Sequence, residues 1–292
     1  MPPRYLVISP VKDEEKFVEH TLGSMVAQTI RPVCWFIVDD GSTDRTPEII
    51  ERYRTEIGWI QLLRNPPGQR RQPGSAVINA FNRGYEAAKG FEYDFVVKLD
   101  CDLSFEADYF ERLLSKFESD SRLGIASGVY LEAPGGTLWS EVEMPPYHAA
   151  GASKILRREC FEQIGGFIPY RGWDTVDEIR AMSLKWRTCH FPEAKMRHWK
   201  LEGAGIGRLR THAMHGEIYY LTSGSKLFFF FKVLHRMMSA PFFIGGIALL
   251  WGYFRLLLSG TQRLVTQDEA RCYRAILNGR ITGKLSRLFK AG

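Results

Sequence analysis

The sequence predicts an α/β fold in which a mostly parallel sheet carries helices on both faces. Four short apolar runs predict strands, at Tyr5–Ile8, Val33–Val38, Trp59–Leu63 and Phe95–Leu99. Segments with helical spacing of apolar residues separate these runs. Regular alternation of strand and helix is typical of a doubly wound sheet, whose ligands lie beyond the carboxyl ends of the strands.

Each intervening helix has its own signal. The first carries apolar residues at i, i+4, i+7 and i+8, namely Val18, Leu22, Met25 and Val26. The second opens at Thr46-Pro47, with proline in its first turn. The third places one apolar face along Val77, Ala80, Phe81, Tyr85 and Ala88. After residue 125 the pattern becomes mixed, with a run at Gly124–Leu131, a helix around Arg158–Ile164 and another from near Asp174.

Acidic residues follow three of the predicted strands. They form the clusters Asp13-Glu14-Glu15, Asp39-Asp40 and Asp100/Asp102. Asp100 and Asp102 are separated by one residue, and residues i and i+2 of an extended chain point the same way. Paired carboxylate oxygens of this kind suit Mg²⁺ or Mn²⁺ that bridges a protein and a substrate's phosphates. We expect one crevice at the sheet edge to gather all three clusters.

The C-terminal region has a different character. A short apolar run at Leu227–Phe231 is followed by residues 242–258, seventeen residues with the single charge Arg255. A spanning helix needs about 20 apolar residues, so a buried hairpin, an interfacial helix and a tilted insertion all stay open. A cap packed on the body and an oligomer interface are the alternatives to membrane contact.

The positive charge of the chain is confined to this end. The net charge is +6, and the residues from Arg255 onward hold eight basic and two acidic side chains, which leaves the first 254 residues formally neutral. A basic tail after a hydrophobic segment favours an anionic membrane face. Nucleic acid is not expected as a partner, because no recognised binding motif accompanies the charge.

Cysteine usage and the N-terminus indicate the compartment. The five cysteines are scattered without a C-x-x-C pair, which argues against a disulfide framework or a zinc site. The start, MPPRYLVISP, is too polar for a signal peptide. We expect a cytoplasmic protein that is peripheral to, or anchored at, the cytoplasmic face of the membrane.

Several motifs in order resemble those of the family-2 glycosyltransferases with the GT-A fold, of the bacterial polysaccharide or glycolipid type. The segments are SPVKDEE, FIVDDGSTDRTPEII, LDCD, GASKILRRECFEQIGGF and GWDTVDEIRA. The resemblance implies a Rossmann-like, mixed but mostly parallel sheet, with a catalytic domain at residues 1–226. It divides that domain into a nucleotide-binding half, 1–125, and an acceptor-binding half, 126–226. Residues 227–292 would form membrane-associated or packing helices.

The resemblance also implies site residues. Nucleotide contacts fall to Pro10, Glu14, Asp39, Asp40 and Asp100, with Asp40 favoured for a uracil contact. Asp100 and Asp102 would hold Mg²⁺ or Mn²⁺, and His198 is the further ligand. Further diphosphate or acceptor contacts are Arg71, Trp173, Arg208 and His212. A surface position for Arg71 and a core position for Trp173 are the alternatives.

Catalysis would rest on the helix near residue 174. Asp174, at the helix start, is the candidate general base for the acceptor hydroxyl. Asp177, one turn later, is the fallback. If neither acts on substrate, Asp174 is an N-terminal cap. Trp173 stands where the family usually has an acidic residue. The Q/R-x-x-R-W motif of the processive synthases is not evident, and its absence favours transfer of a single sugar.

The sequence therefore predicts an inverting, divalent-metal-dependent glycosyltransferase. Its expected donor is a nucleotide-diphosphate sugar, with UDP favoured, and its acceptor a glycolipid or polysaccharide hydroxyl. Two alternatives stay open. A sugar-phosphate nucleotidyltransferase would carry a basic Gly-rich N-terminal loop, where this chain has SPVKDEE. A non-catalytic, membrane-tethered nucleotide-sugar scaffold would have no need of clustered carboxylates.

Overall fold

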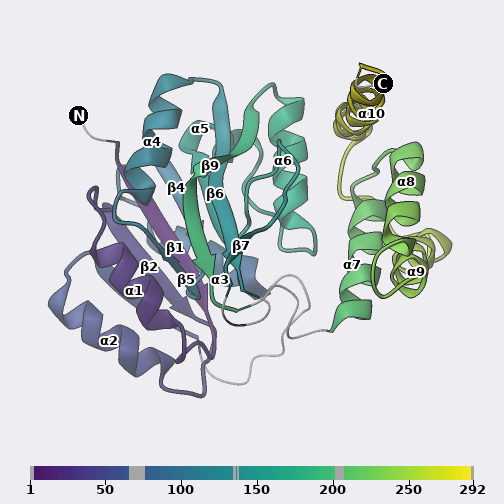
Figure 1. Ribbon diagram of the computed structural model, residues 1–292. Helices are drawn as coiled ribbons and strands as arrows, with labels where there is room; N and C mark the ends of the chain where they lie inside the picture. The colour runs from purple at the N-terminus through teal and green to yellow at the C-terminus, as the bar shows by residue number, and fades with distance from the viewer. Residues whose placement is uncertain (1–2, 66–75, 134–135, 137, 201–206, 291–292) are drawn as a thin grey trace. The chain divides into compact units, whose positions relative to one another are not determined.

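A computed structural model describes residues 3–65, 76–133, 136, 138–200 and 207–290 (Figure 1). The chain divides into two compact units, one of residues 1–181 and 185–201, the other of residues 182–184 and 202–292. The sequence predicts a boundary at residue 226 instead. The structure groups residues 208–221 with the C-terminal helices, because that helix packs against a later one.

The first unit contains all the strands that the structure assigns. These are β1 (Tyr5–Val11), β2 (Cys34–Asp39), β3 (Ile60–Arg64), β4 (Phe95–Leu99), β5 (Leu103–Phe105), β6 (Leu123–Glu132), β7 (Ser140–Glu141), β8 (Ser153–Arg157) and β9 (Arg187–His198). Its helices are α1 (Val18–Val26), α2 (Thr46–Glu56), α3 (Ala76–Ala87), α4 (Tyr109–Ser119), α5 (Arg158–Gln163) and α6 (Trp173–Ser183). The four strands and the helices predicted from periodicity are all present.

The sheet is mixed but keeps a parallel half. Its order is β3-β2-β1-β4-β8-β6-β9-β5, with β7 paired to β6. Strands β3, β2, β1 and β4 run parallel to one another. Strand β8 then pairs antiparallel with β4, and β5 pairs antiparallel with β9. The predicted Rossmann-like, mostly parallel sheet is confirmed, and its carboxyl edge is where β1, β2 and β4 end together.

Burial alternates along the central strands. Tyr5 and Val7 of β1 face one core cluster, and Leu6 and Ile8 face the other. Leu22 of α1 belongs to the first cluster and Phe81 of α3 to the second, so helices cover both faces of the sheet, as predicted. Because both faces are covered, the central strands consist of continuous apolar runs.

The strands that complete the sheet were not predicted. β8 and β9 contain charged residues among apolar ones, and neither shows a clear period of two. They take strand form because β4 and β6 offer edges to pair with. The positions of β8 and β9 in the sheet matter for function. β9 brings His198 close to the residues that follow β4, and β8 lies directly beside β4.

The second unit is helical. It contains α7 (Arg208–Leu221), α8 (Lys226–Met237), α9 (Ile244–Leu258) and α10 (Gln267–Lys290). The hydrophobic segment at 242–258 thus forms α9 and the two residues before it. Among the residues described, no helix has both the length and the apolar character needed to cross a bilayer.

Candidate active site

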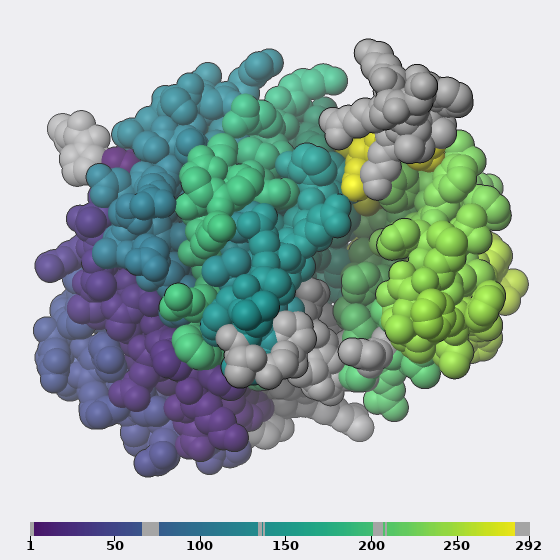
Figure 2. Space-filling view, in the orientation of Figure 1, coloured from purple at the N-terminus to yellow at the C-terminus, as the bar shows by residue number. Residues whose placement is uncertain are grey.

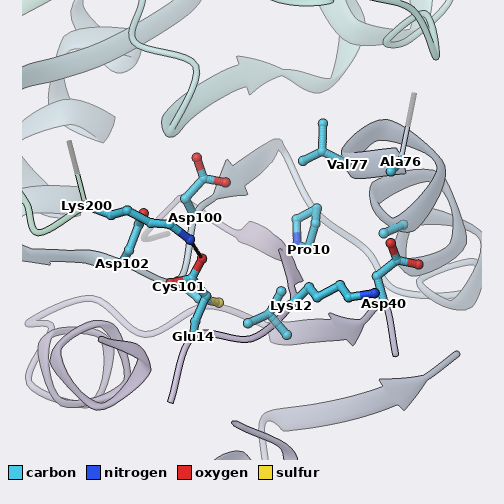
Figure 3. Close-up of a pocket in the computed structure, with 12 residues that line it drawn as sticks. Pro10, Lys12, Glu14, Asp40, Ala76, Val77, Asp100, Cys101, Asp102 and Lys200 are labelled. Carbon is cyan, nitrogen blue, oxygen red and sulfur yellow. Dashed lines mark hydrogen bonds and ion pairs between the residues drawn. The ribbon is translucent and has the colours of Figure 1, made fainter. Parts of the chain in front are cut away.

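A pocket opens at the carboxyl edge of the parallel strands (Figure 3). Its volume is about 440 Å³. It is lined by the end of β1 and the residues after it, by residues that follow β2, β4 and β9, and by the start of α3. The lining residues are Pro10, Val11, Lys12, Glu14, Asp40, Ala76, Val77, Ala80, Asp100, Cys101, Asp102 and Lys200. Five of these had been predicted as site residues, and the pocket lies where an open α/β sheet is expected to bind its ligand.

The two aspartates after β4 lie on one side of this pocket. The N–H of Asp100 donates to the carbonyl of Ala152 at 2.7 Å, which fixes the turn after the strand. Lys98 Nζ donates to Asp100 Oδ1 at 2.6 Å. Burial raises the pKa of the Asp100 carboxyl, Lys98 opposes that shift, and Asp102 adds to it. The pair is therefore a concentrated negative charge that a cation would stabilise.

His198, at the end of β9, lies beside Asp102. Its Nε2 is 3.4 Å from Asp102 Oδ2, and its Nδ1 is 3.0 Å from Glu132 Oε1. Burial would lower the pKa of His198, but Asp102 and Glu132 outweigh it and raise the pKa to about 9. Strand β9 therefore brings the predicted third ligand to the aspartate pair, and Glu132 fixes the orientation of its ring.

These residues fit a divalent cation. Asp102 Oδ1 and Glu14 Oε2 are buried at this edge, and neither has a hydrogen-bond partner within the described part of the chain. A bound cation would satisfy such orphaned oxygens. Still, no three histidine, cysteine, aspartate or glutamate side chains in that part are gathered closely enough to hold a metal by themselves. Mg²⁺ and similar ions commonly take one or two carboxylates and complete their shell with substrate phosphate and water.

The opposite side of the pocket carries Asp40. Its carboxylate accepts from Asn65 Nδ2 at 3.0 Å, and Lys12 also lines the pocket (Figure 3). The Asp39 side chain points the other way, because neighbouring residues of an extended chain point to opposite sides. Asp39 is fully buried, accepts the N–H of Ser42 at 2.9 Å and lies 3.5 Å from the Arg64 guanidinium. The structure thus brings Asp40 into the pocket and uses Asp39 to close the turn after β2.

Glu14 is tied to a residue that the sequence analysis missed. Lys200 Nζ, two residues beyond His198, donates to Glu14 Oε1 at 2.6 Å on the side of the pocket that holds Asp102 (Figure 3). Burial raises the pKa of Glu14, and Lys200 opposes the shift. Strand spacing gives no signal for Lys200, because it lies two residues past the end of β9. Lys200 supplies a positive charge beside the two aspartates.

The predicted base helix, α6, begins close to this edge. The carbonyl of Gly172 accepts the N–H groups of Thr175 and Val176, so Asp174 lies in the first turn. A Cβ built on Gly151 would stand 3.5 Å from Asp174 Oδ2. Gly151 precedes Ala152, to which Asp100 is bonded, so one short segment contacts both aspartates. Asp174 is half-buried and does not line the pocket itself.

Two buried lysines support this arrangement from β4 and β8. Lys98 and Lys154 are cross-strand partners, and both ammonium groups lie over the ring of Trp173, at 5.3 and 5.4 Å from its centroid. Phe167 packs edge-on against the same ring. Trp173 is therefore held between cations and an aromatic neighbour, which supports the packing alternative for this residue.

Lys154 is the centre of a buried charge cluster. Its Nζ donates to the Asp174 carbonyl at 2.8 Å, to Asp177 at 3.0 Å and to Glu178 at 3.2 Å. His148 Nδ1 lies 3.0 Å from the Glu178 carboxylate. Burial would lower the pKa of Lys154, but the two carboxylates outweigh it and raise that pKa. Asp177, the fallback base, is 2% exposed and engaged here, away from the pocket.

We expect Lys154→Met to lower the free energy of unfolding by about 3 kcal/mol, because it leaves two buried carboxylates without their cation. Burial already raises the pKa of Asp177 to about 7, although Lys154 opposes this shift. A carboxyl whose folded-state pKa is raised destabilises the fold increasingly as pH climbs past its unfolded value. The loss should therefore be larger at pH 8 than at pH 5.

Urea denaturation followed by circular dichroism at both pH values measures this. The control is Lys116→Met, which removes a half-exposed lysine paired with Glu193 at 2.7 Å and should cost under about 1 kcal/mol. Equal losses for the two variants, or a Lys154 loss that shrinks at high pH, would contradict the assigned role. A lysine inside an apolar strand, in S-K-I-L, was the sequence signal for this residue.

Three predicted contacts are not tested by the geometry of the pocket. Arg71 lies outside the described residues. Arg208 begins α7, and the structure does not describe its side chain. His212 lies on α7 in the second unit, where its ring is close to Gly245 of α9. Their roles as diphosphate or acceptor contacts stay predictions.

Comparison with known proteins identifies the relatives of this site. The model of the family described as glycosyl transferase family 2 matches residues 6–173, which include the strand ends that line the pocket. The poly-beta-1,6-N-acetyl-D-glucosamine synthase of Staphylococcus aureus is 28% identical over 117 residues, 40% of this chain and 26% of its own length. This chain thus spans about a quarter of that relative, and it matches 36% and 52% of two others.

Solved structures share the fold. The mannosyltransferase PcManGT from Pyrobaculum calidifontis, in complex with GDP-Man and Mn²⁺, aligns with a TM-score of 0.56 at 16% identity, covering 100% of this chain and 83% of that one. TarS residues 1–349 from S. aureus, in complex with UDP-GlcNAc, aligns with a TM-score of 0.55 at 15% identity, covering 92% and 78%. At these identities the likeness concerns the fold, and it agrees with the predicted GT-A architecture.

Proposed function

Since this chain belongs to glycosyl transferase family 2, we propose that it moves one sugar from a nucleotide-diphosphate sugar to an acceptor hydroxyl, with inversion at the anomeric carbon. The observation that carries the proposal is the pocket at the carboxyl edge of the parallel strands. Asp40 lies at one side of it, and Asp100 and Asp102 lie at the other. That separation of acidic groups suits a ligand with a base at one end and phosphates at the other.

The donor is a UDP-sugar in this proposal. Asp40 accepts an N–H from the base edge, and Pro10 and Val77 supply apolar walls beside it. The bound nucleotides of two structural neighbours, GDP-Man and UDP-GlcNAc, support the class of donor. The UDP preference comes from the family resemblance and is the part that the experiment below decides.

The diphosphate would lie toward Asp100 and Asp102, which would hold Mg²⁺ or Mn²⁺ with His198 as a further ligand and with the substrate's phosphates completing the shell. When bound, the cation neutralises the charge that develops on the leaving diphosphate. Mn²⁺ in a structural neighbour supports this choice. Lys200 is placed to add a second positive charge, because its ammonium group already lies between Glu14 and the aspartates.

The acceptor hydroxyl is activated by Asp174. The oxygen of the acceptor hydroxyl attacks the anomeric carbon as the carbon–oxygen bond to the diphosphate breaks. The proton of that hydroxyl passes to the Asp174 carboxylate. One displacement from the face opposite the leaving group inverts the configuration. The position in the first turn of α6 favours the ionised carboxylate before reaction. Lys154, bound to the Asp174 carbonyl, keeps this residue in place.

The acceptor is a hydroxyl of a glycolipid or a polysaccharide unit at an anionic membrane surface. The polysaccharide product named for the S. aureus relative supports the class of acceptor. The basic C-terminal region supports the location, because cations near a bilayer attract anionic headgroups.

Calorimetric titration of UDP, GDP and dTDP, each with and without Mn²⁺, tests the donor assignment. We expect UDP to bind at least about tenfold more tightly than the others, as the family resemblance implies, with a gain from Mn²⁺. Metal-dependent binding of GDP alone would leave the proposed transferase activity standing and would change the proposed donor from a UDP-sugar to a GDP-sugar. Failure of all three nucleotides to bind would contradict the proposed function.

A further inference from the structure

The outer face of α8 and α9 is apolar, which is the reverse of an ordinary surface helix pair. On α8 the exposed positions are Leu227, Phe230, Phe231, Leu234 and, just beyond its end, Met238. They recur at i, i+3, i+4, i+7 and i+11 and so share one side of the helix. On α9 a second stripe comprises Ile244, Ile247, Trp251, Phe254 and Leu258. Phe242 and Phe243, in the connection, are 63% and 66% exposed and join the stripes.

The glycines of α9 lie on the side that packs against α7 and α8, so the large side chains of α9 lie on its exposed side. A Cβ on Gly252 would stand 1.9 Å from the Ala213 carbonyl oxygen of α7. A Cβ on Gly246 would stand 2.3 Å from Met237 of α8. Only this glycine side of α9 can approach its neighbours so closely, so the helix buries Gly245, Gly246, Leu249 and Gly252. The bulky residues on its other side are left exposed, within the surface shown in yellow-green in Figure 2.

The charge around this face has one sign. Residues 218–267 contain no aspartate or glutamate, and they contain Lys226, Lys232, Arg236, Arg255 and Arg263. At 100° per residue, Lys226 and His235 fall on the two edges of the α8 stripe, and both are exposed. Arg255 pairs with Glu217 of α7. A wide apolar surface bordered by cations and free of carboxylates complements an anionic lipid headgroup layer above acyl chains.

We propose that this apolar face, residues 227–258 of α8, α9 and their connection, docks in the interface of an anionic lipid bilayer. Phe230, Phe243 and Trp251 enter the boundary between headgroups and acyl chains, and Lys226 and His235, at the two edges of the α8 stripe, contact the headgroups. Trp251 favours this depth because its indole ring is amphipathic, and Phe230 and Phe243 add buried apolar area. The inference rests on the proposed function, since a membrane-borne acceptor gives the surface its purpose, but binding can be measured without transfer.

Sedimentation with vesicles tests the proposal on the full chain without nucleotide. We expect at least tenfold tighter binding to phosphatidylcholine vesicles containing phosphatidylglycerol than to phosphatidylcholine alone. The triple variant Phe230→Ser, Phe243→Ser, Trp251→Ser should weaken that binding at least tenfold. The matched control, Leu138→Ser with Tyr170→Ser, removes exposed apolar side chains of the first unit and should bind as wild type does.

Further variants separate the possible outcomes. Lys226→Glu with His235→Glu should abolish the preference for anionic vesicles. The Trp251 fluorescence, taken as the difference between the wild type and Trp251→Phe, should be quenched by brominated lipid. Asp102→Ala should bind vesicles normally, which keeps this test independent of the donor site. Absence of vesicle binding, or binding unchanged in the triple variant, would overturn the proposal. The proposal would also be overturned if sedimentation velocity showed a dimer of the wild type and a monomer of the triple variant, because a second copy of the chain would then cover the apolar face.

Discussion

Asp102→Ala is expected to remove the gain in nucleotide affinity that Mn²⁺ provides, a loss of at least about a hundredfold at saturating metal. The alanine deletes both oxygens of a carboxylate whose Oδ1 is buried without a hydrogen-bond partner among the described residues and whose Oδ2 faces His198. A cation bridging protein and diphosphate contributes several kcal/mol of charge stabilisation, and each 1.4 kcal/mol is a factor of ten. Transfer should fall at least as far.

Titration of the nucleotide with and without Mn²⁺ measures the effect. Asp94→Ala is the matched control, because Asp94 precedes β4 at the opposite end of the strand and pairs with Arg4 on the surface. That variant should keep the affinity and lose under about 1 kcal/mol of stability. If Asp102→Ala bound the nucleotide with an unchanged response to Mn²⁺, the metal site would not be at the end of β4.

Asp174→Asn is expected to lower kcat by about 10²- to 10⁴-fold, the range that general-base catalysis contributes. The amide keeps the size of the side chain but cannot take the acceptor's proton. Donor KM and metal-dependent nucleotide binding should stay close to wild type, because Asp174 does not line the donor pocket. Steady-state kinetics with UDP-sugar and a glycolipid acceptor measure whether kcat falls while the donor KM stays unchanged.

Asp177→Asn separates the two candidates for the base. Asp177 is buried against Lys154, so its replacement should lower the unfolding midpoint and change kcat by less than about tenfold. Thermal unfolding and kinetics of both variants are compared. If Asp177→Asn abolished transfer at unchanged stability, and Asp174→Asn retained it, the roles would have to be exchanged.

Local pattern predicted much of the sheet and one part of the site. The run Phe95–Leu99 is a buried strand as predicted, and the two aspartates after it line the pocket with Asp40 and Glu14. The parallel direction of β1, β2, β3 and β4 follows from alternating strands and helices that each bury an apolar face, while their order is known only from the structure. The outward face of α9 could not be predicted, because its seventeen-residue segment is apolar almost all round.

What the sequence by itself determined was which residues share a face and which follow a strand, because strand and helix periods act between near neighbours. The tertiary structure decided what each carboxylate meets. Asp39 closes a turn while Asp40 faces the pocket, and Asp177 is neutralised by Lys154, which is 23 residues away in sequence. His198 comes to Asp102 only because β9 pairs with β5. Burial and charge pairing depend on such distant contacts, and no local spacing encodes them.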